Sequence, residues 1–132
     1  MNKSVAIICV VVVALLIGIG IYGGGPSEEA RAEYETFSQC LADNGATFYG
    51  AFWCPHCGDQ KELLENAASI PYVECSTPDR RGQTQECVDA GIESYPTWEF
   101  ADGERLTGTQ SLETLAEQTG CALPNASDVS AE

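Results

Sequence analysis

Apolar residues between positions 30 and 41 follow a helical repeat. Four of them are spaced by four, three and four residues: Ala30, Tyr34, Phe37 and Leu41. Residues at this spacing lie on one face of a helix. Ser27, followed by two glutamates, is typical of a helix start. Asn44-Gly45 is typical of a helix end. The pattern therefore predicts a helix between Ser27 and Asn44.

The chain from residue 47 to residue 120 alternates between short apolar runs and helical patterns. An aromatic-rich run at 47–53 predicts a buried strand. The helix expected after it has four inward-facing residues: Leu63, Leu64, Ala67 and Ala68. The other expected strands are 72–75, 97–101 and 104–107, and the other expected helices are 83–90 and 111–118. The order α-β-α-β-α-β-β-α predicts an α/β fold with a small mixed sheet.

The N-terminal part of the chain is apolar throughout. Residues 5–22 contain no charged side chain and would form a helix of about 27 Å, close to the thickness of a bilayer core. Residues 1–22 are therefore predicted to be an uncleaved signal anchor, with cleavage near Gly23–Gly25 as the alternative. Because Lys3 precedes the run and all acidic residues follow it, the N-terminus is expected in the cytoplasm. The rest would lie in the periplasm or outside the cell.

The remaining chain is expected to form one folded unit. A glycine-rich linker at 23–27 precedes a domain at 28–121, and a polar tail at 122–132 is expected to be flexible. The sequence has 6 Lys and Arg against 20 Asp and Glu, a formal net charge of −14. This charge argues against binding to nucleic acid or to anionic lipid headgroups. Membrane contact is expected through the N-terminal helix alone, and Arg80-Arg81 is expected to lie on a solvated loop.

The candidate chemistry is a C-x-x-C motif between the first expected strand and the next helix. At a helix N-terminus, unpaired N–H groups and the helix dipole favour a thiolate on Cys54, which would be the nucleophile. Cys57, one turn later, is placed to resolve a mixed disulfide. His56 adds positive charge, and Pro55 suits the first helical turn. A zinc site would need a second ligand pair that the sequence lacks, so no metal or cofactor is expected; a purely structural disulfide is the alternative.

Residues 48–57, FYGAFWCPHC, resemble the active site of thioredoxin-like proteins. Over residues 36–121 the sequence resembles the thioredoxin-like domain fused to bacterial vitamin K epoxide reductase homologues. The resemblance implies a four-stranded mixed sheet flanked by helices, without the N-terminal strand of full thioredoxins. It places a cis-proline at Pro96, whose backbone would align the substrate sulfur. Trp53, Tyr95 and Thr97 would then flank the substrate groove, although Trp53 could instead belong to the core.

Two departures from the family change what is expected of the chain. Thioredoxins carry a buried acid six residues before the first active-site cysteine, where this chain has Phe48. Proton handling would then fall to Asp59, Glu62 or water. The fused family also carries a multi-helix membrane domain with its own cysteine pair and a quinone. Because only one span is predicted here, a separate membrane quinone-linked disulfide oxidase is the expected partner.

Four cysteines lie outside the C-x-x-C motif and the apolar run: Cys40, Cys75, Cys87 and Cys121. They can pair in three ways. The resemblance implies a disulfide between Cys75 and Cys87, either as a structural staple or as a second relay pair. Cys40 and Cys121 would then be left to each other. Their helices can lie on opposite faces of such a sheet, so this second pairing stays open.

Together these features predict an extracytoplasmic thiol–disulfide oxidoreductase. It would give disulfides to folding proteins and would be reoxidised by a vitamin K epoxide reductase-like membrane protein. Its substrates would be proteins with free thiols or disulfides. The alternatives are a membrane-anchored reductase or isomerase, and a redox-inert binding module.

Overall fold

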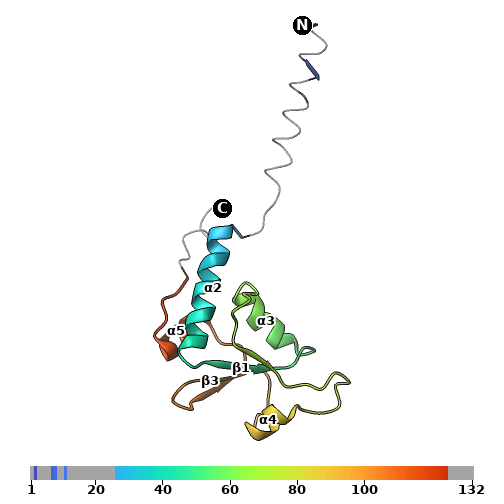
Figure 1. Ribbon diagram of the computed structural model, residues 1–132, viewed down its shortest axis with the longest axis vertical. Coiled ribbons are helices and arrows are strands. Elements are labelled where there is room, and N and C mark those ends of the chain that lie inside the picture. Colours follow the sequence, from blue (N-terminus) through green and yellow to red (C-terminus); the bar gives the residue numbers. More distant parts are fainter. Residues whose placement is uncertain (1, 3–6, 9–10, 12–25, 125–132) are drawn as a thin grey trace.

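The computed structural model describes residues 26–124, together with Asn2, Ile7, Ile8 and Val11 (Figure 1). Most of the predicted anchor 1–22, residues 23–25 of the linker and the tail from residue 125 lie outside the described residues. Among the residues that are described, no helix is both long enough and apolar enough to cross a membrane.

The centre of the domain is a four-stranded sheet with strand order β2-β1-β3-β4. The strands are β1 (Thr47–Gly50), β2 (Tyr72–Glu74), β3 (Thr97–Glu99) and β4 (Arg105–Thr107). β1 runs parallel to β2 and antiparallel to β3, which is antiparallel to β4. The helices are α2 (Glu28–Asp43), α3 (Pro55–Leu63), α4 (Gln85–Asp89) and α5 (Leu112–Thr119). The predicted element order is confirmed, and the mixed sheet with flanking helices fits a thioredoxin-like fold.

The helices are divided unequally between the two faces of the sheet. Figure 1 shows α2, α3 and α5 on one side and α4 on the other. Alternate residues of a strand point to opposite faces, and β1 follows this rule. Phe48 is fully buried and stacks on Trp98 with ring centroids 5.0 Å apart, in the cluster that includes residues of α2, α3 and α5. Tyr49 packs on the other face with Cys75, Cys87 and other residues around α4.

The largest differences from the predicted boundaries lie on the two sides of the C-x-x-C motif, and the later elements begin and end within two residues of their predicted bounds. β1 ends at Gly50 and not at residue 53, because the chain turns there to place Cys54 at the start of α3. α3 ends at Leu63, whereas the predicted helical pattern continues to Ala68. Glu65 and Asn66 have left-handed backbone conformations, which a helix cannot contain. Of the four residues expected to face inward, Leu64 and Ala67 are buried. The other two, Leu63 and Ala68, are exposed.

Candidate active site

Cys54 and Cys57 lie where β1 passes into α3. Cys54 is the N-cap residue of α3, and Pro55 occupies the first helical turn. The backbone N–H of Cys57 donates a hydrogen bond to the Cys54 sulfur over 3.3 Å. Both cysteines carry free thiols. Cys54 is 8% exposed and Cys57 is 1% exposed, so Cys54 is the sulfur that a substrate would reach first.

Cys57 is enclosed by the end of β1. A side chain at Gly50 would place its Cβ 3.0 Å from the Cys57 sulfur and 2.8 Å from the Tyr72 ring, so glycine leaves the room that this thiol occupies. Burial raises the pKa of Cys57 to about 12, and its hydrogen bond with Cys54 acts in the same direction. Cys57 therefore holds its proton firmly in the dithiol form.

Lys61 and Tyr72, two polar side chains that interact with Cys57, were not among the sequence predictions. The Lys61 ammonium lies 3.5 Å from the centre of the Tyr72 ring, and its charge lowers the pKa of Cys57 against the larger effect of burial. The Tyr72 hydroxyl donates to Glu74 over 2.7 Å, and burial raises the pKa of Tyr72. Lys61 follows Cys57 by four residues on α3, a spacing that places two side chains on one helix face. That spacing could have identified Lys61 from the sequence.

The acids expected to replace the missing buried carboxylate lie on the surface of α3. The His56 Nδ1 atom lies 3.3 Å from Asp59 Oδ2, and both side chains are largely exposed. Glu62 is exposed as well. Phe48 is fully buried in the core, at the position of the thioredoxin acid.

The loop before β3 faces the same region. The peptide bond between Tyr95 and Pro96 is cis. The Tyr95 ring meets the Trp53 ring edge to face, with centroids 6.1 Å apart. Trp53 is 44% exposed, so it lies at the surface beside Tyr95 and not in the core. Thr97 is buried, and its hydroxyl donates to the Ser94 carbonyl within the loop.

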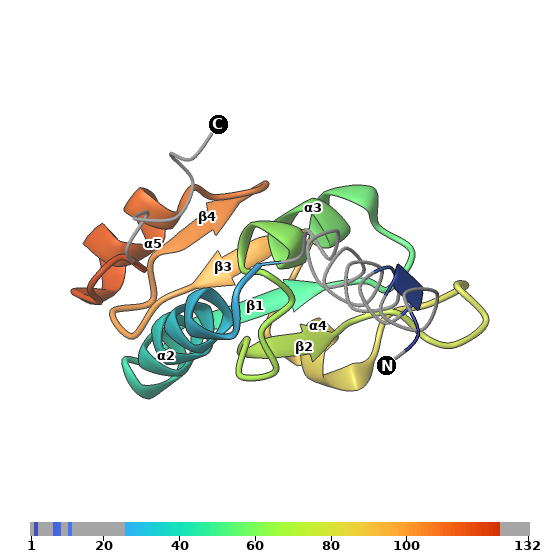
Figure 2. The same cartoon turned by 90° about the horizontal axis from the view of Figure 1, so that it is seen from above.

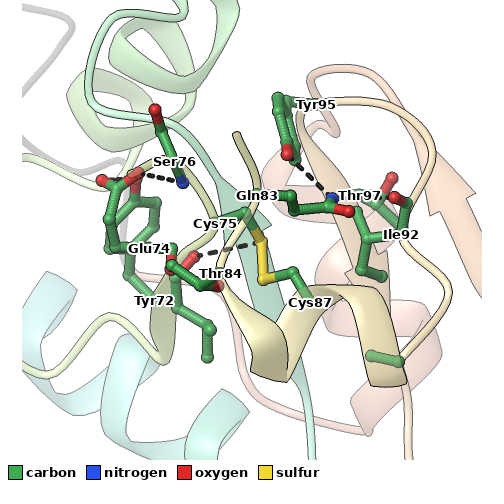
Figure 3. Close-up of a disulfide and its surroundings, with 12 residues drawn as sticks. Tyr72, Glu74, Cys75, Ser76, Gln83, Thr84, Cys87, Ile92, Tyr95 and Thr97 are labelled. Carbon is green, nitrogen blue, oxygen red and sulfur yellow. Dashed lines mark hydrogen bonds between the residues drawn. A yellow bond between two sulfur atoms is a disulfide. The ribbon is translucent and has the colours of Figure 1, made fainter. Parts of the chain in front are cut away.

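A disulfide joins Cys75 to Cys87 next to this site (Figure 3). The two residues beside Cys75 contact the turn that precedes Cys54. Glu74 accepts hydrogen bonds from the backbone N–H groups of Phe52 and Ser76, at 3.2 and 2.8 Å. The Ser76 hydroxyl accepts from the Trp53 indole at 2.7 Å. The Cys75–Cys87 bridge therefore anchors the segment that holds the active-site turn.

The second disulfide joins Cys40 in α2 to Cys121 beyond α5. The two helices lie on the same face of the sheet (Figure 1), which removes the geometrical objection raised by the sequence. In the part of the chain that the structure describes, no group of three or more His, Cys, Asp or Glu side chains is arranged to hold a metal ion.

No model of a known protein family matches the sequence. The chain is similar to thiol-disulfide oxidoreductase LTO1 of Arabidopsis thaliana, with 44% identity over 89 residues. The match covers 64% of this chain and 23% of the plant protein. The chain thus corresponds to less than a quarter of that relative.

Proposed function

We propose that this chain is a thiol–disulfide oxidoreductase whose reactive groups are Cys54 and Cys57, and that it donates disulfides to folding proteins. The observation that carries the proposal is the placement of Cys54 at the N-terminus of α3, with the Cys57 thiol directly behind it. The similarity to a plant thiol-disulfide oxidoreductase supports the same chemistry. The redox-active pair needs no further cofactor, since the two sulfur atoms themselves carry the electrons.

The reaction begins from the disulfide form of the pair. A substrate thiolate attacks the Cys54 sulfur, which forms a mixed disulfide and breaks the Cys54–Cys57 bond. Cys57 leaves with the electron pair and takes up a proton, as the high pKa of its buried thiol favours. A second substrate thiolate then attacks the substrate sulfur of the mixed disulfide and releases Cys54. The substrate loses two electrons in forming its disulfide, and the Cys54–Cys57 pair gains them.

The surroundings suit an extended substrate. The Trp53 and Tyr95 rings contact each other edge to face directly before Cys54 in the fold. An incoming substrate chain would pass along them, and the backbone at Pro96 would align its sulfur. Lys61 would stabilise the transient negative charge on Cys57, because its ammonium is the cation that acts on this thiol.

We further propose that the domain works outside the cytoplasm, held to the membrane by the apolar run at 5–22. Thiols oxidise and disulfides persist in such compartments. A membrane quinone-linked disulfide oxidase, resembling vitamin K epoxide reductase, would accept the two electrons from Cys54 and Cys57 and restore the disulfide. The acidic charge of the chain, −14 in total, is compatible with an exposed domain in this setting.

The test is the equilibrium reduction potential of the Cys54–Cys57 pair. The full chain, with Cys9→Ser to remove the thiol in the apolar run, would be equilibrated in glutathione buffers, with Cys54→Ser as the control. Strong disulfide donors lie near about −120 mV and thioredoxin near about −270 mV. We expect a value above about −200 mV. A value below about −250 mV would instead assign the chain to the reductases, and no exchange at all would leave a redox-inert module.

A further inference from the structure

The loop at residues 76–83 lies beside the active-site turn, and its two ends are hydrogen-bonded to Trp53 in that turn and to Tyr95 in the loop before β3. Figures 1 and 2 show this loop, between β2 and α4, projecting next to the turn that leads into α3. Ser76 at its start accepts the hydrogen bond from Trp53. Gln83 at its end donates to the Tyr95 hydroxyl over 2.8 Å (Figure 3). We call this segment the arginine loop, after Arg80 and Arg81.

Internal hydrogen bonds fix the shape of the arginine loop. The N–H of Thr77 donates to the Gly82 carbonyl at 3.0 Å, and the N–H of Gly82 donates to the Thr77 hydroxyl at 3.0 Å. Asp79 accepts from the Thr77 hydroxyl and from the backbone of Arg81. Arg80 adopts a left-handed backbone conformation with φ of 61°, which is uncommon for a residue with a side chain. The loop therefore presents its arginines from a defined scaffold.

The arginines bring positive charge to an otherwise acidic protein. The whole chain has 6 Lys and Arg against 20 acidic residues. Within residues 26–124, Arg105 is paired with Glu99, whereas Arg80 and Arg81 form no ion pair. The adjoining Asp79 carboxylate accepts hydrogen bonds from the Thr77 hydroxyl and the Arg81 backbone. The Glu74 carboxylate accepts three, from two backbone N–H groups and the Tyr72 hydroxyl. The arginines therefore remain available to an external anion.

The arginines also adjoin exposed aromatic surface. The Arg80 guanidinium lies 5.2 Å from the centre of the Phe52 ring. Phe52 is 51% exposed and its neighbour Trp53 is 44% exposed, and both immediately precede Cys54. A cation and two exposed aromatic rings thus lie on or beside the turn that leads into the reactive cysteine.

We propose that the arginine loop selects polypeptide substrates that carry an acidic residue close to the reacting cysteine. The proposal rests on the function proposed above, and it assigns the occupant of this surface by charge complementarity. A carboxylate on the substrate would meet Arg80 and Arg81, while apolar neighbours would contact Phe52 and Trp53. The local positive charge offsets the repulsion that the acidic protein exerts on such segments at longer range.

The test compares three flexible peptides that differ at one position. Each carries a single cysteine, with Glu, Gln or Lys two residues away. The measured quantity is the second-order rate constant for attack on the oxidised full chain in the Cys9→Ser background, at low and high salt. The variants are Arg80→Gln in the loop and Arg31→Gln as the control, so that each removes one positive charge. Arg31 is an exposed cation on α2, so removing it lowers the net charge at a distance from the site.

We expect the loop variant to lower the ratio of the Glu rate to the Lys rate by about threefold or more, as expected for exposed ion pairs. Arg31→Gln should leave this ratio nearly unchanged, and high salt should reduce the effect of the loop variant. Dithiothreitol carries no charged group besides its attacking thiolate, so its rate should change less in the loop variant than the rate with the Glu peptide. Equal changes in the two variants would overturn the proposal, because they would show a general charge effect. If the parent protein itself does not react with dithiothreitol, the proposed function is refuted.

Discussion

Cys57 and Cys54 differ in what surrounds each sulfur, and this difference sets their roles. The Cys54 sulfur accepts a hydrogen bond from the backbone N–H of Cys57 at the N-terminus of α3. Cys57 is packed against Gly50 and Tyr72, where burial penalises a charged sulfur. The attacked sulfur is thus the one that accepts a backbone hydrogen bond at the helix terminus. The buried sulfur is the one that keeps a proton.

The pH dependence of the reduction potential follows from this asymmetry. Because the pKa of Cys57 is raised to about 12, reduction takes up at least one proton at any lower pH. Raising the pH lowers the concentration of the protons that reduction consumes and so disfavours the dithiol, and the potential must fall. For a two-electron couple the fall is at least about 30 mV per pH unit. Equilibration with dithiothreitol between pH 7 and 10 measures this slope. A potential that levels off within that range would contradict the assignment of a protonated Cys57.

Gly50 is the residue that makes room for Cys57. Alanine there would bring its Cβ within 3.0 Å of the sulfur and 2.8 Å of the Tyr72 ring. We expect Gly50→Ala to lower the free energy of unfolding by about 1–3 kcal/mol, as overpacking does in other cores. Urea denaturation of the oxidised protein measures this change in the free energy of unfolding.

Gly58 provides the matched control for this substitution. It lies in α3, and no atom lies within 4 Å of an added Cβ. Gly58→Ala should raise the free energy of unfolding by about 0.5–1 kcal/mol, because alanine favours the helix. If both substitutions had the same sign, the close packing around Cys57 would not be the cause.

At the scale of elements, Gln60 joins α3 to the sheet and to the loop before α5. This side chain is fully buried. Its carbonyl oxygen accepts from the Trp98 indole at 3.1 Å and from the backbone N–H of Gln110 at 2.7 Å. Its amide donates to the Gln110 carbonyl. One polar residue thus fixes the helix that carries Cys57 against β3.

Removing this amide should destabilise the domain more than the loss of a surface glutamine. Gln60→Leu would leave two buried N–H groups without partners, at a cost of about 2–5 kcal/mol in unfolding free energy. The control is Gln39→Leu on α2, an exposed side chain that bonds only to Asp43. It should change stability by less than about 0.5 kcal/mol. A near-neutral Gln60→Leu in urea denaturation would show that water replaces the lost contacts.

These elements show which parts of the fold could be predicted from the sequence. Periodicity identified every helix and strand in order, because it reflects the burial of one face. It extended β1 through Trp53, since the aromatic pattern continues where the backbone turns. The end of α3 was also missed, because Glu65 and Asn66 adopt left-handed conformations that no glycine marks. The partners of Gln60 depend on residues far along the chain, and no local pattern indicates them.

At the scale of the whole molecule, two disulfides hold distant parts of the chain. Cys75–Cys87 spans a sequence separation of 12 and supports the active-site side. Cys40–Cys121 spans a separation of 81 and joins the first and last helices of the domain. The Asn44 amide, three residues before β1, donates to both sulfur atoms of the second bridge, whereas Cys54 follows the end of that strand. The Cys75–Cys87 bridge therefore supports the active site, and the Cys40–Cys121 bridge connects the first and last helices of the domain.

Removal of each bridge should separate these two roles. Closing a longer loop restricts the unfolded chain more, so Cys40→Ala with Cys121→Ala should cost about 4–5 kcal/mol and the Cys75–Cys87 pair about 3 kcal/mol. At a temperature where both proteins stay folded, only the loss of Cys75–Cys87 should slow attack of a peptide thiol on Cys54, because Glu74 and Ser76 would release the active-site turn. Urea denaturation and stopped-flow exchange measure the two effects. Slowed exchange in the Cys40 and Cys121 variant, with native stability, would reverse the assignment and tie the helix bridge to the reactive site.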